Sequence, residues 1–237
     1  MKITYIAHSG FLAELEHTLL LFDYYQGEVP ELPRDKKLYV FASHRHPDHF
    51  NPEIFQLAKD REQVWYVLSH DIWKSRVPEE WKARTVHLKP GTEWEHEGVG
   101  VQTLRSTDEG VAFLVQAEGK TLYHAGDLND WRWEGEPENW NRQMEEKFHR
   151  YIEPLRGKHM DAAFVPLDPR QEKNYALGLD YFLSLADPLA PLSGADKIYP
   201  MHCWDKYAVI DRWLAEHPDS PYRERIVRIR KRGEVFW

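Results

Sequence analysis

The sequence predicts a layered α/β domain, in which strands pair into sheets and helices cover the faces of those sheets. Three observations support this prediction. Apolar runs of strand length recur along the chain, turn-forming pairs such as Pro90-Gly91 separate them, and longer segments with helical spacing lie between them. Hydrophobic residues make up 42% of the 237 residues, which is enough for a sizeable core. With no repeat or low-complexity linker, we expect one domain over residues 1–237.

The predicted strands are short apolar runs that end at glycine, proline or polar residues. One of them, residues 38–42, is too apolar to alternate between two faces, so we expect it to be buried on both sides. The predicted strands cover residues 2–6, 11–15, 18–24, 38–42, 64–68, 85–88, 98–104, 111–117, 121–124, 162–166, 197–201 and 226–229.

The predicted helices begin at favourable residues or carry apolar side chains at helical spacing. Asn51 is a good N-cap and Pro52 suits the first turn, so one helix should start there and end near Lys59. Apolar residues from Trp140 to Ile152 recur with helical period. The predicted helices cover residues 51–59, 70–75, 138–155, 174–187 and 205–216.

Composition argues against several classes of protein. The 31 lysine and arginine residues against 39 aspartate and glutamate residues give a net charge of −8, so binding to nucleic acid through bulk charge is not expected. The single cysteine, Cys203, excludes a disulfide framework and a cysteine-rich zinc module. No apolar run approaches the length of a membrane span, and Met1–His8 is typical of a strand rather than a targeting segment. We therefore expect a cytoplasmic protein without a membrane partner.

The most informative segment is His44-Arg-His-Pro-Asp-His49, which places three histidines and one aspartate within six residues. Imidazole and carboxylate groups are ligands for zinc, iron and manganese. In an extended loop, His44 and His46 project to one side, and Asp48 and His49 then turn towards a second position. The segment also follows a predicted buried strand, where α/β folds place ligand sites. It can therefore supply two neighbouring metal ions.

This motif and three other segments of the chain resemble the metallo-β-lactamase superfamily of metal-dependent hydrolases. Lys120–Asp127 is similar to the family strand whose terminal aspartate bridges two metals, and Ile198–His202 to the late strand that ends in the last histidine ligand. An early strand ending in Asp23 matches as well. The resemblance covers nearly the whole chain. It implies a four-layer αββα sandwich with the metals at one edge between the sheets.

The resemblance also implies residue roles. A hydroxide held between the metals would be the nucleophile, with Asp48 and Asp127 as the catalytic carboxylates and Asp23 orienting a ligand imidazole. His44 and His46 would hold metal one. Asp48, His49 and His202 would hold metal two. Asp127 would bridge the two ions.

One departure from the family pattern concerns metal one. The family usually has a further histidine before the strand predicted at 111–117, but residues 104–110 contain none. Asp108 is the best substitute, with Ser106 or Thr107 hydrogen-bonding to metal-bound water; the alternative is a weakened or empty first site. We therefore expect metal one to bind more weakly than metal two.

Other residues are assigned to the substrate or to structural roles. His8, Tyr24 and Trp131 are the predicted substrate contacts, although His8 also suits a strand-end hydrogen bond and Trp131 also suits a core between helices. Asp168 follows a predicted buried strand before a proline, and capping of a turn is its expected role.

The resemblance implies an enzyme that hydrolyses an ester, lactone, amide or phosphoester bond of a small molecule. The expected cofactor is zinc, as one or two ions, with iron or manganese as alternatives because the ligand set lacks a thiolate. The alternative functions are a metallonuclease that processes nucleic acid, a weakly catalytic descendant with an incomplete metal site, and redox chemistry on a di-iron centre. The substrate and the oligomeric state, including a homo-oligomer, stay open.

Overall fold

The computed structural model describes residues 1–186 and 193–237 and contains two mixed β-sheets. The first sheet has seven strands in the order β13-β1-β2-β3-β4-β5-β6, and the second has six in the order β12-β11-β10-β9-β8-β7. The strands of the first sheet are β1 (Lys2–Ala7), β2 (Gly10–Glu14), β3 (Thr18–Phe22), β4 (Lys37–Ala42), β5 (Val64–Ser69), β6 (Thr85–Leu88) and β13 (Val235–Phe236). Those of the second are β7 (Glu93–His96), β8 (Val99–Arg105), β9 (Val111–Ala117), β10 (Lys120–His124), β11 (His159–Pro166) and β12 (Gly194–Met201).

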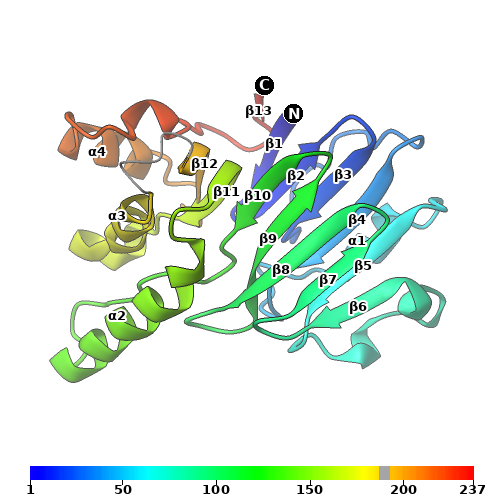
Figure 1. Cartoon of the computed structure of the whole chain (residues 1–237), viewed down its shortest axis with the longest axis horizontal. Coiled ribbons are helices and arrows are strands. Elements are labelled where there is room, and N and C mark those ends of the chain that lie inside the picture. Colours follow the sequence, from blue (N-terminus) through cyan, green and yellow to red (C-terminus); the bar gives the residue numbers. More distant parts are fainter. Residues whose placement is uncertain (187–192) are drawn as a thin grey trace.

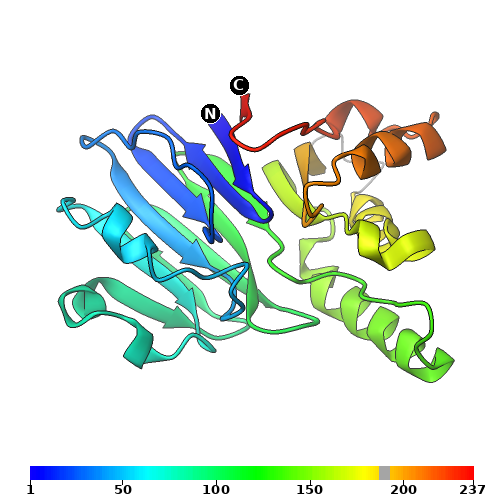
Figure 2. The ribbon, with the colours of Figure 1, turned by 180° about the vertical axis from the view of Figure 1, so that it is seen from behind.

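The two sheets pack face to face through aromatic side chains. Phe22 and Phe41 of the first sheet stack with ring centroids 4.8 Å apart, and Phe41 meets Phe113 of the second sheet at 5.3 Å. Phe11 contacts Phe164 across the same interface at 4.4 Å. All five rings are fully buried, and such aromatic contacts contribute strongly to a core. In the view from behind, the N-terminal strands lie in front of the second sheet, and the chain ends meet where β1 pairs with β13 (Figure 2).

Helices cover the outer faces of the sheets. Figure 1 shows α2 (Glu138–Ile152), α3 (Leu177–Ser184) and α4 (Ala208–Glu216) gathered on the side of β11 and β12. The apolar stripe of α2 buries Met144, Phe148 and Ile152, one residue per turn, as the sequence predicted. The outer face of the first sheet is covered by α1 (Ile54–Leu57) and by 3₁₀ turns at Lys74–Arg76 and Glu79–Arg84, over a second apolar cluster. Further 3₁₀ turns lie at Glu153–Leu155, Pro169–Asn174 and Arg223–Arg225. The four-layer αββα arrangement is therefore confirmed.

Strands that run in the same direction have their C-terminal ends at the same edge of each sheet. β1, β3 and β4 run in one direction, because β2 is antiparallel to both of its neighbours and β3 pairs in parallel with β4. In the second sheet β8, β10, β11 and β12 likewise share a direction. Residues that directly follow these strands therefore meet at one edge, although they lie far apart in sequence.

Several predicted elements differ from the structure. The helix expected over 51–59 is only the four residues of α1, because Asn51 Oδ1 accepts a hydrogen bond from Glu53 N in a local turn and the chain then leaves the helical path. The strand predicted at 226–229 is wrong. Only Ile226 bridges to β12, after which the chain crosses to β1 and forms β13. β7 and β13 were not predicted, and residue 187, the expected end of one helix, lies outside the described residues.

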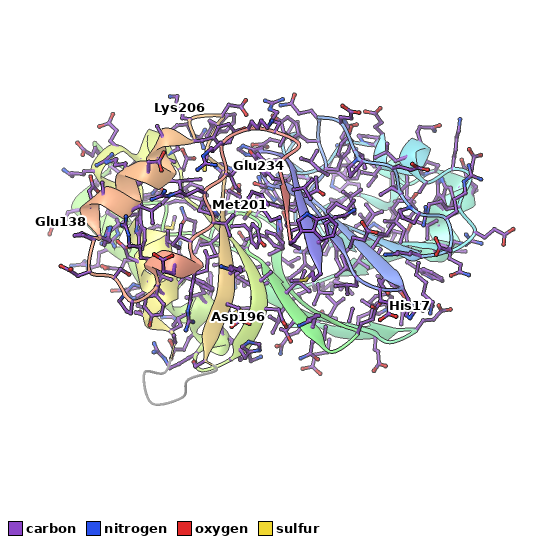
Figure 3. All side chains as sticks on the ribbon, turned by 90° about the horizontal axis from the view of Figure 1, so that it is seen from above. His17, Glu138, Asp196, Met201, Lys206 and Glu234 are labelled. Carbon is purple, nitrogen blue, oxygen red and sulfur yellow. The ribbon has the colours of Figure 1, made fainter. Side chains whose placement is uncertain are left out.

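None of the helices in the described part of the chain has the length and apolar character that crossing a bilayer requires. In the view from above, Met201, the last residue of β12, lies between Glu138 towards one end of the molecule and His17 towards the other (Figure 3).

Candidate metal centre

The candidate ligands all lie at the edge where the parallel strands end. His8 follows β1, the motif at 44–49 follows β4, and His202 follows β12. Asp127 comes three residues after β10, and Asp108 comes three residues after β8. The predicted convergence of the motif with Asp127 and His202 is therefore present in the structure.

The converging side chains form two groups that each suit a metal ion. Within each group, one ligand atom per residue lies within 4.8 Å of every other. One group is His8, Asp48, His49 and His202, and the other is His44, His46, Asp108 and Asp127. Asp108 thus stands in the group that lacks the expected histidine.

Asp127 lies between the two groups. Its Oδ1 is 3.2 Å from Nε2 of His49 and 3.4 Å from Nε2 of His202, while its Oδ2 is 3.5 Å from Nε2 of His44. The two oxygens therefore face different histidines, as a carboxylate shared between two neighbouring ions requires. Its backbone carbonyl accepts hydrogen bonds from Trp131 Nε1 at 2.8 Å and Thr107 Oγ1 at 3.2 Å, which fix the loop.

The bonding state of these atoms fits a metal ion. Nε2 of His8, His49 and His202, together with Oδ1 of Asp127, are buried and form no hydrogen bond of normal geometry with any described residue. Buried polar atoms without a partner are rare and costly, and a bound cation would satisfy all four atoms at once. The donor set of imidazole and carboxylate is one that zinc, iron and manganese accept.

The opposite ring nitrogens are held by the protein. His49 Nδ1 lies 2.7 Å from Asp23 Oδ2, and His202 Nδ1 lies 2.9 Å from Asp168 Oδ2. His44 Nδ1 lies 3.0 Å from Ser43 Oγ. A carboxylate at Nδ1 keeps the proton on that nitrogen and leaves the Nε2 lone pair free, which is the usual arrangement behind a metal-ligating histidine.

Burial and charge tune the protonation of the centre. Burial lowers the pKa of His8 and of His44 to about 4, so both rings are neutral at pH 7. For Asp127, burial alone would raise the pKa, but the adjacent His49, His202 and His44 outweigh it and hold the carboxyl well below its usual range. Asp48 is held low in the same way by His8, whose Nε2 lies 3.4 Å from its Oδ2. His49 is the exception: burial would lower its pKa, but Asp127 and Asp23 outweigh burial and raise the pKa well above its usual value. Metal binding at this ring must therefore displace a proton.

We expect the metal-free protein to lose stability on acidification. The unfolded chain protonates His8 and His44 near pH 6.5, whereas the folded state does so only near pH 4. Between these values the unfolded state binds more protons, so the free energy of unfolding should fall by up to about 1.4 kcal/mol per pH unit for each histidine. Urea unfolding of chelator-treated protein at pH 6, 5 and 4.5 measures this, below the range in which the raised pKa of His49 acts with the opposite sign, and a pH-independent midpoint contradicts it.

The two groups differ in exposure. The side chains of His46 and Asp108 are 40% and 44% exposed, whereas His49 is fully buried and His202 is 3% exposed. Burial, reinforced by the Asp127 charge, raises the pKa of Asp108 above its usual value. A more exposed group with a less readily ionised carboxyl binds a cation less tightly, which agrees with the asymmetry expected from the sequence.

Backbone strain is concentrated around the centre. His8, Asp23 and His202 adopt positive φ values of 55°, 42° and 63°, a region that non-glycine residues seldom occupy. Two glycines allow the loops to pack against the motif. A Cβ on Gly110 would lie 2.0 Å from the Ser43 carbonyl oxygen, and one on Gly126 would lie 2.7 Å from Ser43 Cβ.

A hollow of about 230 Å³ opens beside the centre. Trp131, a predicted substrate contact, lines it with Asp127 and His202. Tyr24 does not reach it: the side chain is 5% exposed in the apolar cluster under α1, and its hydroxyl donates to the Gly27 carbonyl. Its neighbour Tyr25 instead brings its ring to 5.8 Å from that of His8. The prediction for Tyr24 is therefore corrected.

Asp168 was predicted to cap a turn, and it does accept a hydrogen bond from Arg170 N at 2.9 Å. Its further role was missed. It also holds His202 Nδ1 and lies 3.3 Å from Trp204 Nε1. Burial would raise its pKa, but His202 and the Arg170 guanidinium outweigh this effect and bring it to about 2.

Asp168→Asn is expected to weaken metal binding by roughly ten- to a hundredfold, because an amide cannot hold the His202 proton as a carboxylate does. Isothermal titration of the metal-free variant with zinc measures the change. Asp196→Asn, at a carboxylate that is 57% exposed, is the matched control. Equal zinc affinity in both variants would mean that Asp168 only caps the turn.

A third group, Asp130, Glu145 and His149, also has metal-ligand spacing. Arg132 already pairs with both carboxylates, at 2.7 Å from Asp130 Oδ2 and 3.0 Å from Glu145 Oε1. Because this cation already pairs with both carboxylates, we assign the group a structural role.

Comparison with known proteins agrees with this geometry. Residues 2–136 match the family model described as a beta-lactamase superfamily domain. A metal-dependent hydrolase from Opitutus terrae is 33% identical over 146 residues, which cover 54% of this chain and 63% of that protein. A second, from Carboxydothermus hydrogenoformans, is 30% identical over 142 residues, 54% of this chain and 62% of that protein. The aligned stretch thus spans less than two thirds of each relative.

Solved structures extend the likeness in fold to the whole chain. A possible metal-dependent hydrolase from Veillonella parvula superposes with a TM-score of 0.64 at 10% identity, over 100% of this chain and 98% of that one. A metallo hydrolase from Ignicoccus hospitalis gives 0.61 at 15% identity, over 99% and 97%. The family match covers more than half of the sequence, so this chain belongs to the metallo-β-lactamase superfamily.

Proposed function

We propose that this protein is a metal-dependent hydrolase that acts on a small molecule. The observation that carries the proposal is the convergence of four buried atoms that form no hydrogen bond of normal geometry with any described residue, Nε2 of three histidines and Oδ1 of Asp127, at the edge between the sheets. The names of the relatives in Opitutus terrae and Carboxydothermus hydrogenoformans support the same activity.

The ligands divide between two positions. His44, His46 and Asp108 would hold the first ion, and Asp127 would contribute to both positions. The second ion would be held by His8, Asp48, His49 and His202. Bound dications lower the pKa of water towards 7 and stabilise negative charge that develops on the scissile group. Zinc is the proposed metal, because the set combines histidines with carboxylates, and iron or manganese would suit the same donors.

The chain's own groups prepare this centre. Asp23 and Asp168 fix the ring orientation of His49 and His202. Asp48 and Asp127 stay ionised at neutral pH and supply the negative charge that holds the cations. Trp131 packs its ring 5.3 Å from that of His202 and gives the hollow part of its apolar lining. The proposed bonds are those of esters, lactones, amides and phosphoesters, in molecules small enough to enter 230 Å³.

A substrate screen of metal-replete protein tests the proposal. Wild-type protein is loaded with one or two equivalents of zinc and assayed with lactones, thioesters, phosphodiesters and β-lactams. The His46→Ala variant is assayed in the same way. We expect turnover of at least one class that rises with metal content and falls in the variant. Protein that retains no metal would support the weakly catalytic descendant instead, and turnover confined to oligonucleotides would support a nuclease.

Asp108 tests the composition of the first position. Asp108→Ala should reduce metal occupancy at the first position. Asp108→His should keep occupancy at or above that of the wild type, because an imidazole binds zinc in its neutral form, whereas the Asp108 carboxyl, whose pKa is raised, must ionise first. Titration with a chelator should release two ions in separate steps from the wild type. A single cooperative release, or unchanged metal content in Asp108→Ala, would show that Asp108 is not a ligand.

A further inference from the structure

We propose that the hollow beside the metal centre selects substrates with one planar, apolar ring, which packs against a wall of tryptophans while the reacting group lies towards the metal ligands. This inference rests on the proposed hydrolase function, and it adds the class of substrate.

The wall comes from two segments that the fold brings together. Trp131 and Trp133 belong to the loop after Asp127, and Trp140 and Met144 belong to α2. Asp108 and Asp127 line the same hollow. The lining therefore combines aromatic rings with carboxylates of the metal centre, and a small molecule with an apolar ring and a polar reacting group matches both parts of it.

The wall is held rigidly before any ligand enters. The rings of Trp131 and Trp133 are nearly parallel, at 6° with centroids 6.0 Å apart. Trp131 Nε1 donates to the Asp127 carbonyl, and the backbone N and O of Trp133 are both bound to the Asn141 side chain at 3.0 Å. A preformed aromatic surface loses little conformational entropy on binding, so it favours a rigid flat partner.

The volume of the hollow suits about one ring within it. A cavity of roughly 150 Å³ is enough to take up benzene. The hollow here measures about 230 Å³, which leaves space for a ring and a short reacting group.

The charge at the rim indicates that the ring is neutral. Arg170 lines the hollow, but its Nε and Nη2 are bonded to the Asp168 carboxylate, and its guanidinium lies 4.3 Å from the Trp204 ring centroid. The positive charge is therefore paired with Asp168, although the Arg170 side chain is 44% exposed, and the guanidinium also lies 5.9 Å from the Trp133 ring centroid. This pairing means that Arg170 does not require an anionic substituent on the ring.

Binding of simple carboxylates to zinc-loaded protein tests the inference without any turnover. Benzoate and cyclohexanecarboxylate carry the same charge and number of carbons, but only benzoate is planar. By calorimetric titration we expect benzoate to bind roughly three- to tenfold more tightly. Trp133→Leu and Trp140→Leu should each reduce this ratio towards one, and Trp133→Phe should keep most of it. Trp73→Leu, at a tryptophan that is 66% exposed, is the control and should leave the ratio unchanged.

Two results would overturn the inference: equal affinity for the two acids in the wild type, or a benzoate preference that survives in both leucine variants. Failure of the proposed function looks different. In that case benzoate still binds through the tryptophans while no ester or lactone is hydrolysed. Conversely, hydrolysis of phenyl and alkyl esters at equal rates, together with equal binding of the acids, retains the hydrolase and removes the ring site.

Discussion

Asp127→Asn should lower kcat/KM on whichever substrate is found by on the order of a hundred- to a thousandfold. It should also reduce the metal content from two ions to one or none. The physical reason lies in the two oxygens of Asp127, which face His49 and His202 on one side and His44 on the other. An amide keeps only one acceptor oxygen, and its NH₂ group would repel a cation on the side that it faces.

Two measurements decide this prediction, kcat/KM and metal content after dialysis. Asp196→Asn, which alters an exposed carboxylate of β12, should match the wild type in both. If Asp127→Asn retained two ions and full activity, the two groups of ligands would not share this carboxylate, and the proposed centre would have to be rebuilt around one ion.

Much of the centre could be predicted because its ligands are concentrated in one motif. Four metal-competent side chains between His44 and His49 cannot all serve as turn caps, and their chemistry is independent of the rest of the fold. Asp108 was inferred as a ligand from the absence of a histidine in residues 104–110, and that role stays a prediction. The structure brings it into the group with His44 and His46.

The residues whose surroundings were not foreseen depend on strand register and direction. His8 was predicted to contact substrate, which stays a prediction, and its Nε2 lies in the group with Asp48 and His49. Asp168 was assigned to a turn, because only the parallel pairing of β11 with β12 brings it beside His202. Like His202, His8 and Asp168 lie within two residues of the end of a predicted strand. This position was the only sign in the sequence that they could lie near the metal ligands. It is informative only when the strands are known to run in the same direction.

Tyr24 and the helix expected over 51–59 show a different limit. Tyr24 follows Asp23, and the positive φ of Asp23 turns the chain so that the next side chain enters the apolar cluster under α1. A backbone conformation of this kind is not visible in the residue pattern, because most aspartates do not adopt it and the surrounding structure decides which one does. Likewise, capping residues at 51–53 mark where a helix can start, but packing decides how far it continues.

Asp23→Asn should destabilise the fold and weaken the second metal position together, because the carboxylate is fully buried and serves three donors. It accepts hydrogen bonds from Ser43 N at 2.7 Å and Ser43 Oγ at 2.6 Å, and its Oδ2 lies 2.7 Å from His49 Nδ1. An asparagine can accept from Ser43 N, but its NH₂ group then meets the His49 Nδ1–H. His49 can avoid this clash by moving its proton to Nε2, which removes the lone pair that would bind the metal.

We expect the free energy of unfolding of the metal-free protein to fall by about 3 kcal/mol, as for a broken buried charge–hydrogen-bond network. Zinc affinity should fall by roughly ten- to a hundredfold. Urea unfolding and zinc titration measure the two effects separately. Asp211→Asn, at a carboxylate that is 72% exposed, is the control and should change neither quantity. Loss of stability with unchanged zinc affinity would show that Asp23 supports the Ser43 turn but does not set the tautomer of His49, and the orientation of that ring would then depend on Ser43 alone.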